Sequence, residues 1–168
     1  MLIENNRPKL EIPLSSFEIV IQLVCALGIV EIFLTLFLSW HKIPSRIPTH
    51  FGPSGSIDAW GGKSSLLALP IIMLVIYALL STIEKFPRIY NYMCDITEQN
   101  AEFQYRNARM MIGCMKLEMI FLFGYIEWKT VQVALNKAAG LGVEFMHVFL
   151  IVMFGTIGFF IFRMVKYK

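Results

Sequence analysis

The sequence predicts an all-α integral membrane protein with four transmembrane helices and a structured extracytoplasmic loop between the first and second helix. Two observations lead to this prediction. First, 57% of the 168 residues are hydrophobic and only 16% are charged, which is too apolar for a soluble domain of this length. Second, the charged residues lie mostly outside four long apolar runs, as a bilayer requires, because a charge at mid-depth is costly.

The first apolar run, residues 17–40, is expected to form a helix that crosses the membrane. Its 24 residues would give about 36 Å of helix, enough for a hydrocarbon core of about 30 Å. Ser15 and Glu18 have the spacing of a capping box, so the helix should begin beside them. A cleaved signal peptide is not expected, because the run is long, lacks a small-x-small cleavage site and contains Glu31.

Three further runs predict the remaining spans. Residues 66–83 form the second, with Pro70 near its start, where a missing N–H group does least harm. Residues 110–128 form the third, preceded without a break by a cytoplasmic helical extension at about 97–109 that Thr97 should cap. Residues 143–162 form the fourth. The chain, residues 1–168, is expected to be a single membrane domain.

Lysine and arginine residues are distributed unequally between the two predicted ends of the bundle. Nine lie in the N-terminal segment, the second connection and the C-terminus, and five lie in the first and third connections. The positive-inside rule therefore predicts a multi-pass protein with both termini in the cytoplasm and residues 41–65 on the outer face. The basic residues flank apolar segments, which favours membrane lipids over nucleic acid as partners. The three cysteines, Cys25, Cys94 and Cys114, are interpreted as reduced packing residues.

The connection at residues 41–65 is polar and rich in turn-forming residues. Two Ile-Pro pairs favour extended backbone, and four glycines between residues 52 and 62 allow tight turns. Trp40 and Trp60 suit the headgroup layer of a membrane. The loop is therefore expected to be a structured cap on the helix bundle.

This loop also carries a family resemblance. The pattern Ile43-Pro44-x-x-Ile47-Pro48-Thr49-His50-Phe51-Gly52-x-x-Gly55-x-x-Asp58-x-Trp60-Gly61-x-Lys63 resembles the signature of a bacterial membrane family known as domain of unknown function 1648. That domain forms the N-terminal part of SdpI immunity proteins, which protect a producer from its own secreted toxin peptide. A weaker resemblance covers residues 96–106 and Lys116-x-Glu118. The resemblance implies a small polytopic protein of the bacterial cytoplasmic membrane, with an immunity or signalling role in some relatives and a toxin peptide or amphiphile as partner. It implies no reaction.

The residues of the loop that are expected to bind a ligand are His50, Phe51, Asp58, Trp60 and Lys63. The alternative for His50 and Asp58 is that they tie the turns of the loop to backbone groups. Lys63 either holds a lipid phosphate or an anionic partner, or it is an ordinary snorkelling residue at a helix entrance.

A divalent metal is an alternative cofactor for the same region. Glu144 and His147 share one face at the start of the fourth span. If they met the first loop, then His50, Asp58, Glu144 and His147 would form a set of nitrogen and oxygen ligands suited to zinc, which can activate water.

Two acidic residues, Glu31 and Glu118, lie well inside predicted spans. Such a residue is a candidate proton relay or an acceptor for a cationic amphiphile, or it is hydrogen-bonded inside the bundle. Lys116 lies two residues from Glu118 and does not share its face, so any pairing should be between helices. Glu127 and Glu144 lie near span ends and are expected to contact water.

The function predicted first is non-enzymatic recognition of a peptide, lipid or other ligand through the outer loop. Its serines lack a Gly-x-Ser-x-Gly setting, and neither a P-loop nor a Gly-x-Gly-x-x-Gly pattern is present in the sequence. The alternatives are a membrane-embedded metal-dependent enzyme that acts on a lipid or peptide, and a small proton-coupled transporter or one of its subunits. Assembly into a homo-oligomer is left open.

Overall fold

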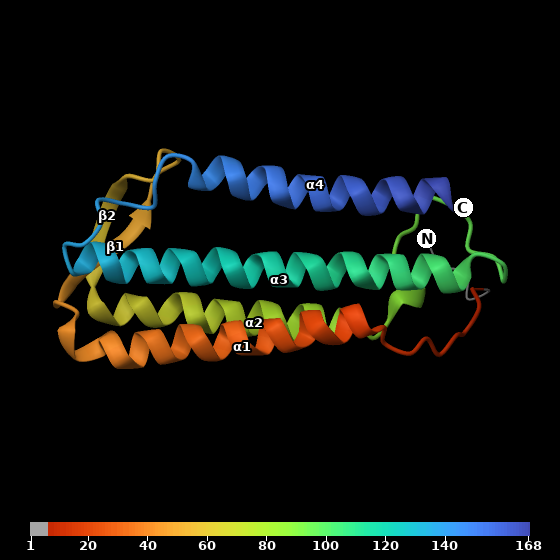
Figure 1. Ribbon diagram of the computed structural model, residues 1–168, viewed down its shortest axis with the longest axis horizontal. Coiled ribbons are helices and arrows are strands. Elements are labelled where there is room, and N and C mark those ends of the chain that lie inside the picture. The colour runs from red at the N-terminus through yellow and green to blue at the C-terminus, as the bar shows by residue number, and fades with distance from the viewer. Residues whose placement is uncertain (1–6) are drawn as a thin grey trace.

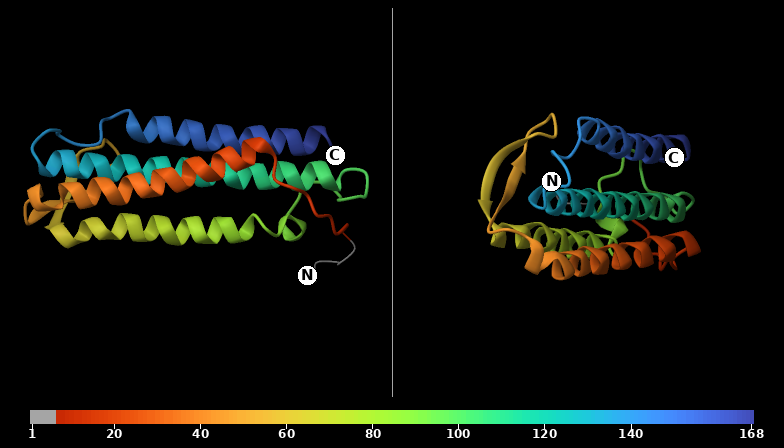
Figure 2. Two further views of the ribbon diagram at one scale, coloured as in Figure 1. Left: turned by 60° about the horizontal axis from the view of Figure 1, so that its bottom comes forward. Right: turned by 60° about the vertical axis from the view of Figure 1, so that its left-hand side comes forward.

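The computed structural model describes residues 7–168, so the first six residues of the predicted domain lie outside the described residues. Four long helices run side by side along the molecule (Figure 1): α1 Ser16–Ser39, α2 Ala68–Ile83, α3 Ala101–Ala134 and α4 Phe145–Lys166. Helix α3 lies in the middle, with α1 and α2 on one side and α4 on the other (Figure 2). The C-terminus and the connection between α2 and α3 lie at one end of the bundle. A β-hairpin lies at the other.

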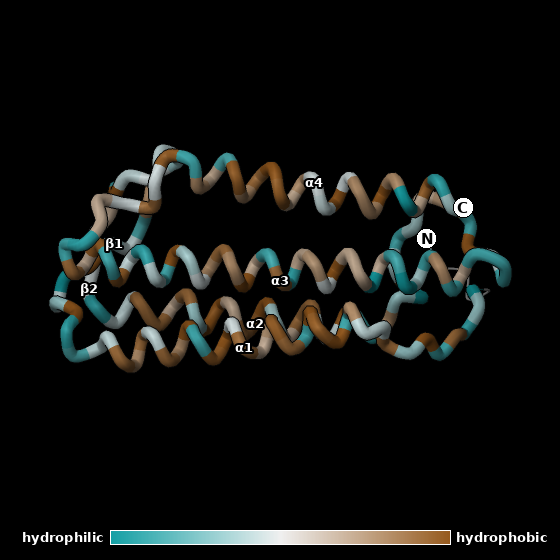
Figure 3. The backbone as a smooth tube through the Cα atoms, in the orientation of Figure 1, coloured by the Kyte–Doolittle hydropathy of each residue, from teal (hydrophilic) through white to brown (hydrophobic). Residues whose placement is uncertain are grey.

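Composition supports a membrane location for three of these helices. Within residues 7–168, the segments Ser16–Lys42, Lys63–Ile83 and Phe145–Lys166 are long and apolar enough to cross a bilayer. The sequence predicted four spans, and α3 does not reach the same apolarity. Its polar residues are visible along the tube in Figure 3. Several of them are buried inside the chain: Gln104, Asn107, Lys116, Glu127 and Thr130.

The ends of the helices follow local signals with two exceptions. The capping box is confirmed, because the Glu18 backbone N–H donates to Ser15 Oγ and the Ser15 N–H donates to Glu18 Oε2 at 2.8 Å. Helix α3 begins at Ala101 after Asn100, so the prediction of Thr97 as its cap and of a start at 97 is wrong. Asn100 Oδ1 accepts from the Thr97 N–H at 2.9 Å, which holds residues 97–100 in a turn before the helix.

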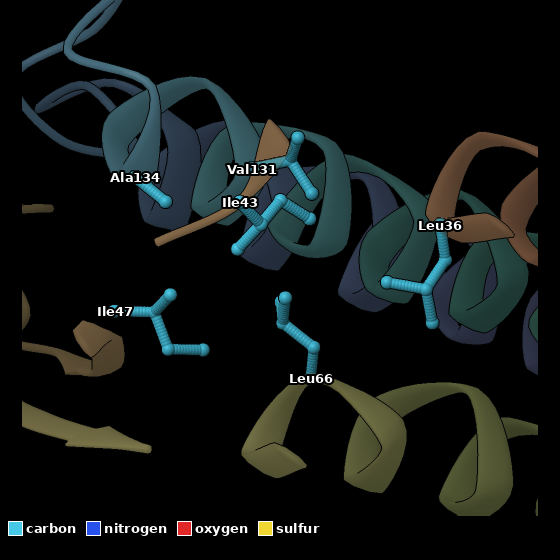
Figure 4. Packing of buried hydrophobic residues seen from close by; sticks show 6 residues of the cluster. All are labelled: Leu36, Ile43, Ile47, Leu66, Val131 and Ala134. Atoms are coloured by element: carbon cyan, nitrogen blue, oxygen red, sulfur yellow. The ribbon is translucent and has the colours of Figure 1, made fainter. Parts of the chain in front are cut away.

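Helix α3 also continues past Trp128, the predicted end of the third span, to Ala134. The extra turns are buried beneath the hairpin, where Val131 and Ala134 join a hydrophobic cluster with Leu36, Ile43, Ile47 and Leu66 (Figure 4). Burial of this face stabilises the helix beyond the apolar run, which the sequence pattern alone does not show.

A second hydrophobic cluster fills the space between α1, α2 and α3 near the middle of the bundle. It consists of Ile21, Cys25, Ile32, Met73 and Ile120. Cys25 belongs to this cluster and Cys114 packs against it, in agreement with their interpretation as packing residues. Cys94 is also free, but it belongs to neither hydrophobic cluster.

Helix α4 packs less closely on its neighbours and is held by polar groups of α3. Gln104 Nε2 donates to the carbonyl oxygens of Met164 and Tyr167, both at 3.0 Å. Asn107 Nδ2 donates to the Phe160 carbonyl oxygen, also at 3.0 Å. Such bonds between helices are a common means of association in lipid, where apolar contact gains little over contact with acyl chains.

The predicted structured loop contains an antiparallel β-hairpin, formed by β1 Arg46–Phe51 and β2 Ile57–Gly62. Three short 3₁₀ helices, η1 Trp40–Lys42, η2 Lys63–Leu67 and η3 Pro87–Ile89, complete the described elements. The Ile-Pro pairs predicted extended backbone, but the prediction of an all-α fold did not include paired strands.

Candidate functional site

The hairpin positions the loop residues singled out from the sequence. Ile47 faces the helices and is 1% exposed, Pro48 beside it is also buried, and Thr49 and His50 reach the surface. The pairing of β1 with β2 is irregular between Pro48 and His50, which re-aims the side chains at that point. His50 Nδ1 lies 2.6 Å from Asp58 Oδ1, and the side chains are 68% and 48% exposed. The two residues therefore form a water-accessible pair on the hairpin.

The tip of the hairpin is fixed to the connection between α3 and α4. The Leu141 N–H donates to the Gly55 carbonyl oxygen at 2.9 Å. Gly55 has a φ of +74°, and a Cβ placed on it would lie 2.5 Å from the Gly142 carbonyl oxygen. Only glycine combines this backbone conformation with so close an approach. Gly55 therefore serves a contact between two connections that no local pattern reveals.

Lys63 and Trp60 are placed at the base of the hairpin. Lys63 Nζ donates to the Trp40 carbonyl oxygen and lies 4.5 Å from the centroid of the Trp40 ring. The ammonium group is thus engaged within the chain, which favours the structural interpretation of Lys63 over binding of a lipid phosphate. Trp60 is 48% exposed and has the Arg46 guanidinium 6.0 Å from its ring centroid.

Beneath the hairpin lies a cavity of about 460 Å³, enclosed by β1, α2, α3 and α4. Its walls are mostly apolar, and Phe51 and His50 lie at the hairpin side. A second cavity of about 730 Å³ adjoins it between α3 and α4 and contains Glu118 and Glu144 among its lining residues. The two cavities share Leu122, Leu141, Phe145 and Phe149. Beside them, Tyr125 of α3 stacks on Phe145 at the start of α4, with ring centroids 4.6 Å apart.

The two acids that were predicted to lie within spans, Glu31 and Glu118, occupy different surroundings. Glu118 accepts a short hydrogen bond from Thr156 Oγ1, so it links α3 to α4. Glu31 accepts from Thr35 Oγ1 of its own helix at 2.8 Å and remains exposed. Glu118 is thus hydrogen-bonded inside the bundle, which is one of the alternatives that the sequence left open. The hydrogen bond of Glu31 stays within its own helix.

The four residues considered as metal ligands are not gathered into one group. His50 pairs with Asp58, Glu144 lies exposed beside the first turn of α4, and His147 Nδ1 lies 3.2 Å from the Val143 carbonyl oxygen. No cluster of three or more His, Cys, Asp or Glu side chains able to hold a metal ion occurs among residues 7–168.

The sequence reasoning missed a buried ionic network between α1, α2 and α3. Lys116 is 1% exposed, and its Nζ donates to Glu84 Oε2 at 2.7 Å, to Gln22 Oε1 at 2.8 Å and to Ser81 Oγ at 3.1 Å. Lys116 therefore pairs between helices, as expected, but with Glu84 and not with Glu118. In the sequence, the isolated polar residues Gln22 and Ser81 within apolar runs could have indicated this network.

Two other acidic residues behave unexpectedly. Arg109 Nε donates to Glu18 Oε1 at 2.6 Å, so the N-terminal acid of α1 is paired with α3. Glu127 is 1% exposed, and neither carboxyl oxygen has a hydrogen-bond partner among the described residues. The expectation that Glu127 contacts water is wrong, because its face of α3 continues the stripe that packs against α1 and α2.

Comparisons with known proteins agree with the resemblance read from the loop. An uncharacterized protein of Archaeoglobus fulgidus is 32% identical over 59 residues, which cover 35% of this chain and 32% of that protein. The similarity thus spans about a third of the relative, and no solved structure matches the chain. Residues 27–74, which include the hairpin and parts of α1 and α2, match the family model described as Domain of unknown function (DUF1648). The predicted resemblance to the DUF1648 family is therefore confirmed for this segment.

Proposed function

We propose that this protein is a membrane receptor for an amphipathic ligand, which it binds in the space beneath the hairpin. The observation that supports the proposal is the pair of adjoining apolar cavities between α3 and α4, closed at one end by the hairpin. Ligand sites in proteins are typically concave and apolar with a few placed polar groups. Here His50, which lines the cavity beneath the hairpin and pairs with the exposed Asp58, supplies a polar group at the hairpin side.

The apolar part of the ligand would lie against Leu122, Phe145 and Phe149, which line both cavities. Its polar part would meet His50. With Nδ1 directed at the Asp58 carboxylate, the Nε2 atom of the imidazole is left to contact the ligand. A lipid and a hydrophobic peptide share this amphipathic chemistry. The toxin peptide implied by the family resemblance is one example of the second.

The proposed location is the cytoplasmic membrane of a bacterium, with four spans and both termini in the cytoplasm. Helix α3 would cross as well, because several of its polar side chains are buried, and Asn107 and Lys116 are bonded to neighbouring helices. The excess of lysine and arginine at the end of the bundle opposite the hairpin supports this orientation.

The binding proposal can be tested with a photoreactive phosphatidylglycerol that carries a diazirine on its acyl chain. Purified protein in nanodiscs is irradiated, and the cross-linked residues are mapped by mass spectrometry. We expect cross-links to concentrate on α3 near Leu122 and on residues 141–149. Leu122 lines both cavities, so Leu122→Trp should fill part of this space and suppress the cross-links.

Leu79→Trp is the matched control, since Leu79 is 58% exposed on α2 and lines neither cavity. It should leave the cross-links unchanged. Cross-links that spread evenly over the outer faces of the helices, and that Leu122→Trp does not alter, would show lipid contact without a site and would contradict the proposal.

A further inference from the structure

A groove of about 570 Å³ runs between α1 and α3 and shares Phe121 and Tyr125 with the cavity between α3 and α4. Its walls are apolar and aromatic, with Val24 and Leu27 from α1 and Phe121, Tyr125 and Trp128 from α3. Glu31 is the one acidic or basic residue that lines it. The groove therefore combines a long apolar surface with a single carboxylate.

Glu31 lies within the segment Ser16–Lys42, which is apolar enough to cross a membrane, and its side chain is exposed on the outside of the bundle. Thr35 donates to one carboxyl oxygen, and among residues 7–168 Glu31 takes part in no ion pair. A carboxylate in such a place is costly unless a cation or hydrogen-bond donor meets it. Of the acids elsewhere in the bundle, Glu84 and Glu118 have partners on neighbouring helices. Glu127 is buried without a partner among the described residues, but it does not line this groove.

We propose that this groove binds an amphiphile with an ammonium headgroup. The ammonium group pairs with the free oxygen of Glu31, and the alkyl chain lies along Val24, Leu27 and Phe121. In a site of low dielectric constant this ion pair is stronger than in water. Tyr125 and Trp128 line the same groove, and the Lys129 Nζ atom lies 5.7 and 5.3 Å from their ring centroids, so these rings already attract a cation of the chain.

A second copy of the chain is a less suitable occupant. A two-fold contact through the same groove on both copies would bring two Glu31 carboxylates toward each other, and no lysine or arginine lines the groove to compensate them. Charge complementarity thus favours a cationic ligand. A free alkylammonium compound and an amine-bearing lipid headgroup present the same chemistry.

The test uses the fluorescence of Trp128, which lines the groove, in a Trp40→Phe, Trp60→Phe background that leaves it as the single tryptophan. The protein is purified in dodecyl maltoside micelles. A bromine-labelled alkylammonium, 11-bromoundecylammonium, should quench Trp128 at lower concentration than the neutral 11-bromoundecanol. Glu31→Gln keeps the size of the side chain and should weaken binding of the cation about tenfold, as expected for a hydrogen bond to a charged group.

Glu102→Gln is the control, because Glu102 is exposed in the first turn of α3 and does not line the groove, so this variant should not affect quenching. Added phosphatidylethanolamine should compete with the probe if the natural source is a lipid headgroup, and should not compete if it is a free amine.

Equal quenching by the cation and the alcohol would contradict the proposal, as would a Glu31→Gln variant that binds the cation normally. Loss of binding in Glu118→Gln, with normal binding in Glu31→Gln, would place the cation beneath the hairpin and would also contradict the proposal. A native dimer in sedimentation that Glu31→Gln dissociates would show that a second copy covers the groove.

Discussion

Lys116 carries a positive charge into the interior of the helix bundle, and three neighbouring side chains satisfy its three donors. Its partners come from two helices, Gln22 from α1 and Ser81 and Glu84 from the end of α2. Gln22 Nε2 also donates to Glu84 Oε2 at 2.8 Å, so the carboxylate is shared. Loss of a single member leaves another buried group without a partner.

We therefore predict that Lys116→Met lowers the free energy of unfolding by about 3 kcal/mol, because it leaves the Glu84 carboxylate buried and uncompensated. The double variant Lys116→Met, Glu84→Gln should recover part of the loss. Unfolding in mixed micelles with increasing dodecyl sulfate measures both. Glu102→Gln breaks the exposed Arg106–Glu102 pair and should change stability by less than about 1 kcal/mol. A loss in Lys116→Met no larger than in Glu102→Gln would contradict the network.

At the scale of elements, the hairpin and the connection between α3 and α4 behave as one unit, because Gly55 meets residues 140–142 directly. We predict that Gly55→Ala destabilises the protein by about 1–3 kcal/mol, since it strains a positive φ and displaces a backbone carbonyl. The tip of the hairpin should separate from the connection, and trypsin should cleave faster after Lys137.

Gly62→Ala provides the control for this substitution. Gly62 does not have a positive φ, and a Cβ there would approach only Ser64 Oγ, at 3.9 Å. Rates of cleavage and stability should match those of the native chain. If Gly55→Ala behaves like Gly62→Ala, the hairpin does not depend on this contact.

The attachment of α4 depends on polar contacts. A comparison of Thr156 with Thr82 separates the effect of a hydrogen bond between helices from that of a threonine within one helix. Thr156 Oγ1 donates to Glu118 on α3, whereas Thr82 Oγ1 donates to the Ala78 carbonyl oxygen of its own helix at 2.8 Å. We predict that Thr156→Val lowers stability by about 1 kcal/mol and that Thr82→Val has almost no effect. Thermal unfolding in detergent compares the two. Equal losses would mean that the bond between helices contributes nothing.

At the scale of the whole molecule, the topology depends on whether α3 crosses the membrane. We predict that, after replacement of the native cysteines, Ser54→Cys and Lys137→Cys react with a membrane-impermeant maleimide in intact cells. Glu98→Cys should react only after permeabilisation, because α3 would place it on the other side. Labelling of Lys137→Cys and Glu98→Cys under the same conditions would show that α3 does not cross. Labelling of Glu98→Cys alone in intact cells would reverse the orientation.

The sequence by itself determined the apolar segments, the capping box at Ser15 and Glu18, the folded nature of the loop after α1 and its family resemblance. These properties depend on composition, on residues three positions apart, or on a short pattern of fixed spacing, so the local chain contains them. The start of α3 at Ala101 was misread, because Asn100 and Thr97 both qualify as local caps and only the surrounding structure selects between them.

Only the tertiary structure decided which polar groups meet. Lys116 and Glu84 lie on different helices, and the contact of Gly55 with residues 140–142 joins two connections far apart in the chain. The burial of Glu127 depends on which face of α3 turns inward, and the hydropathy of α3 does not reveal that face. Pairing and burial result from the packing of whole helices, which a bilayer allows in several arrangements of similar apolar segments.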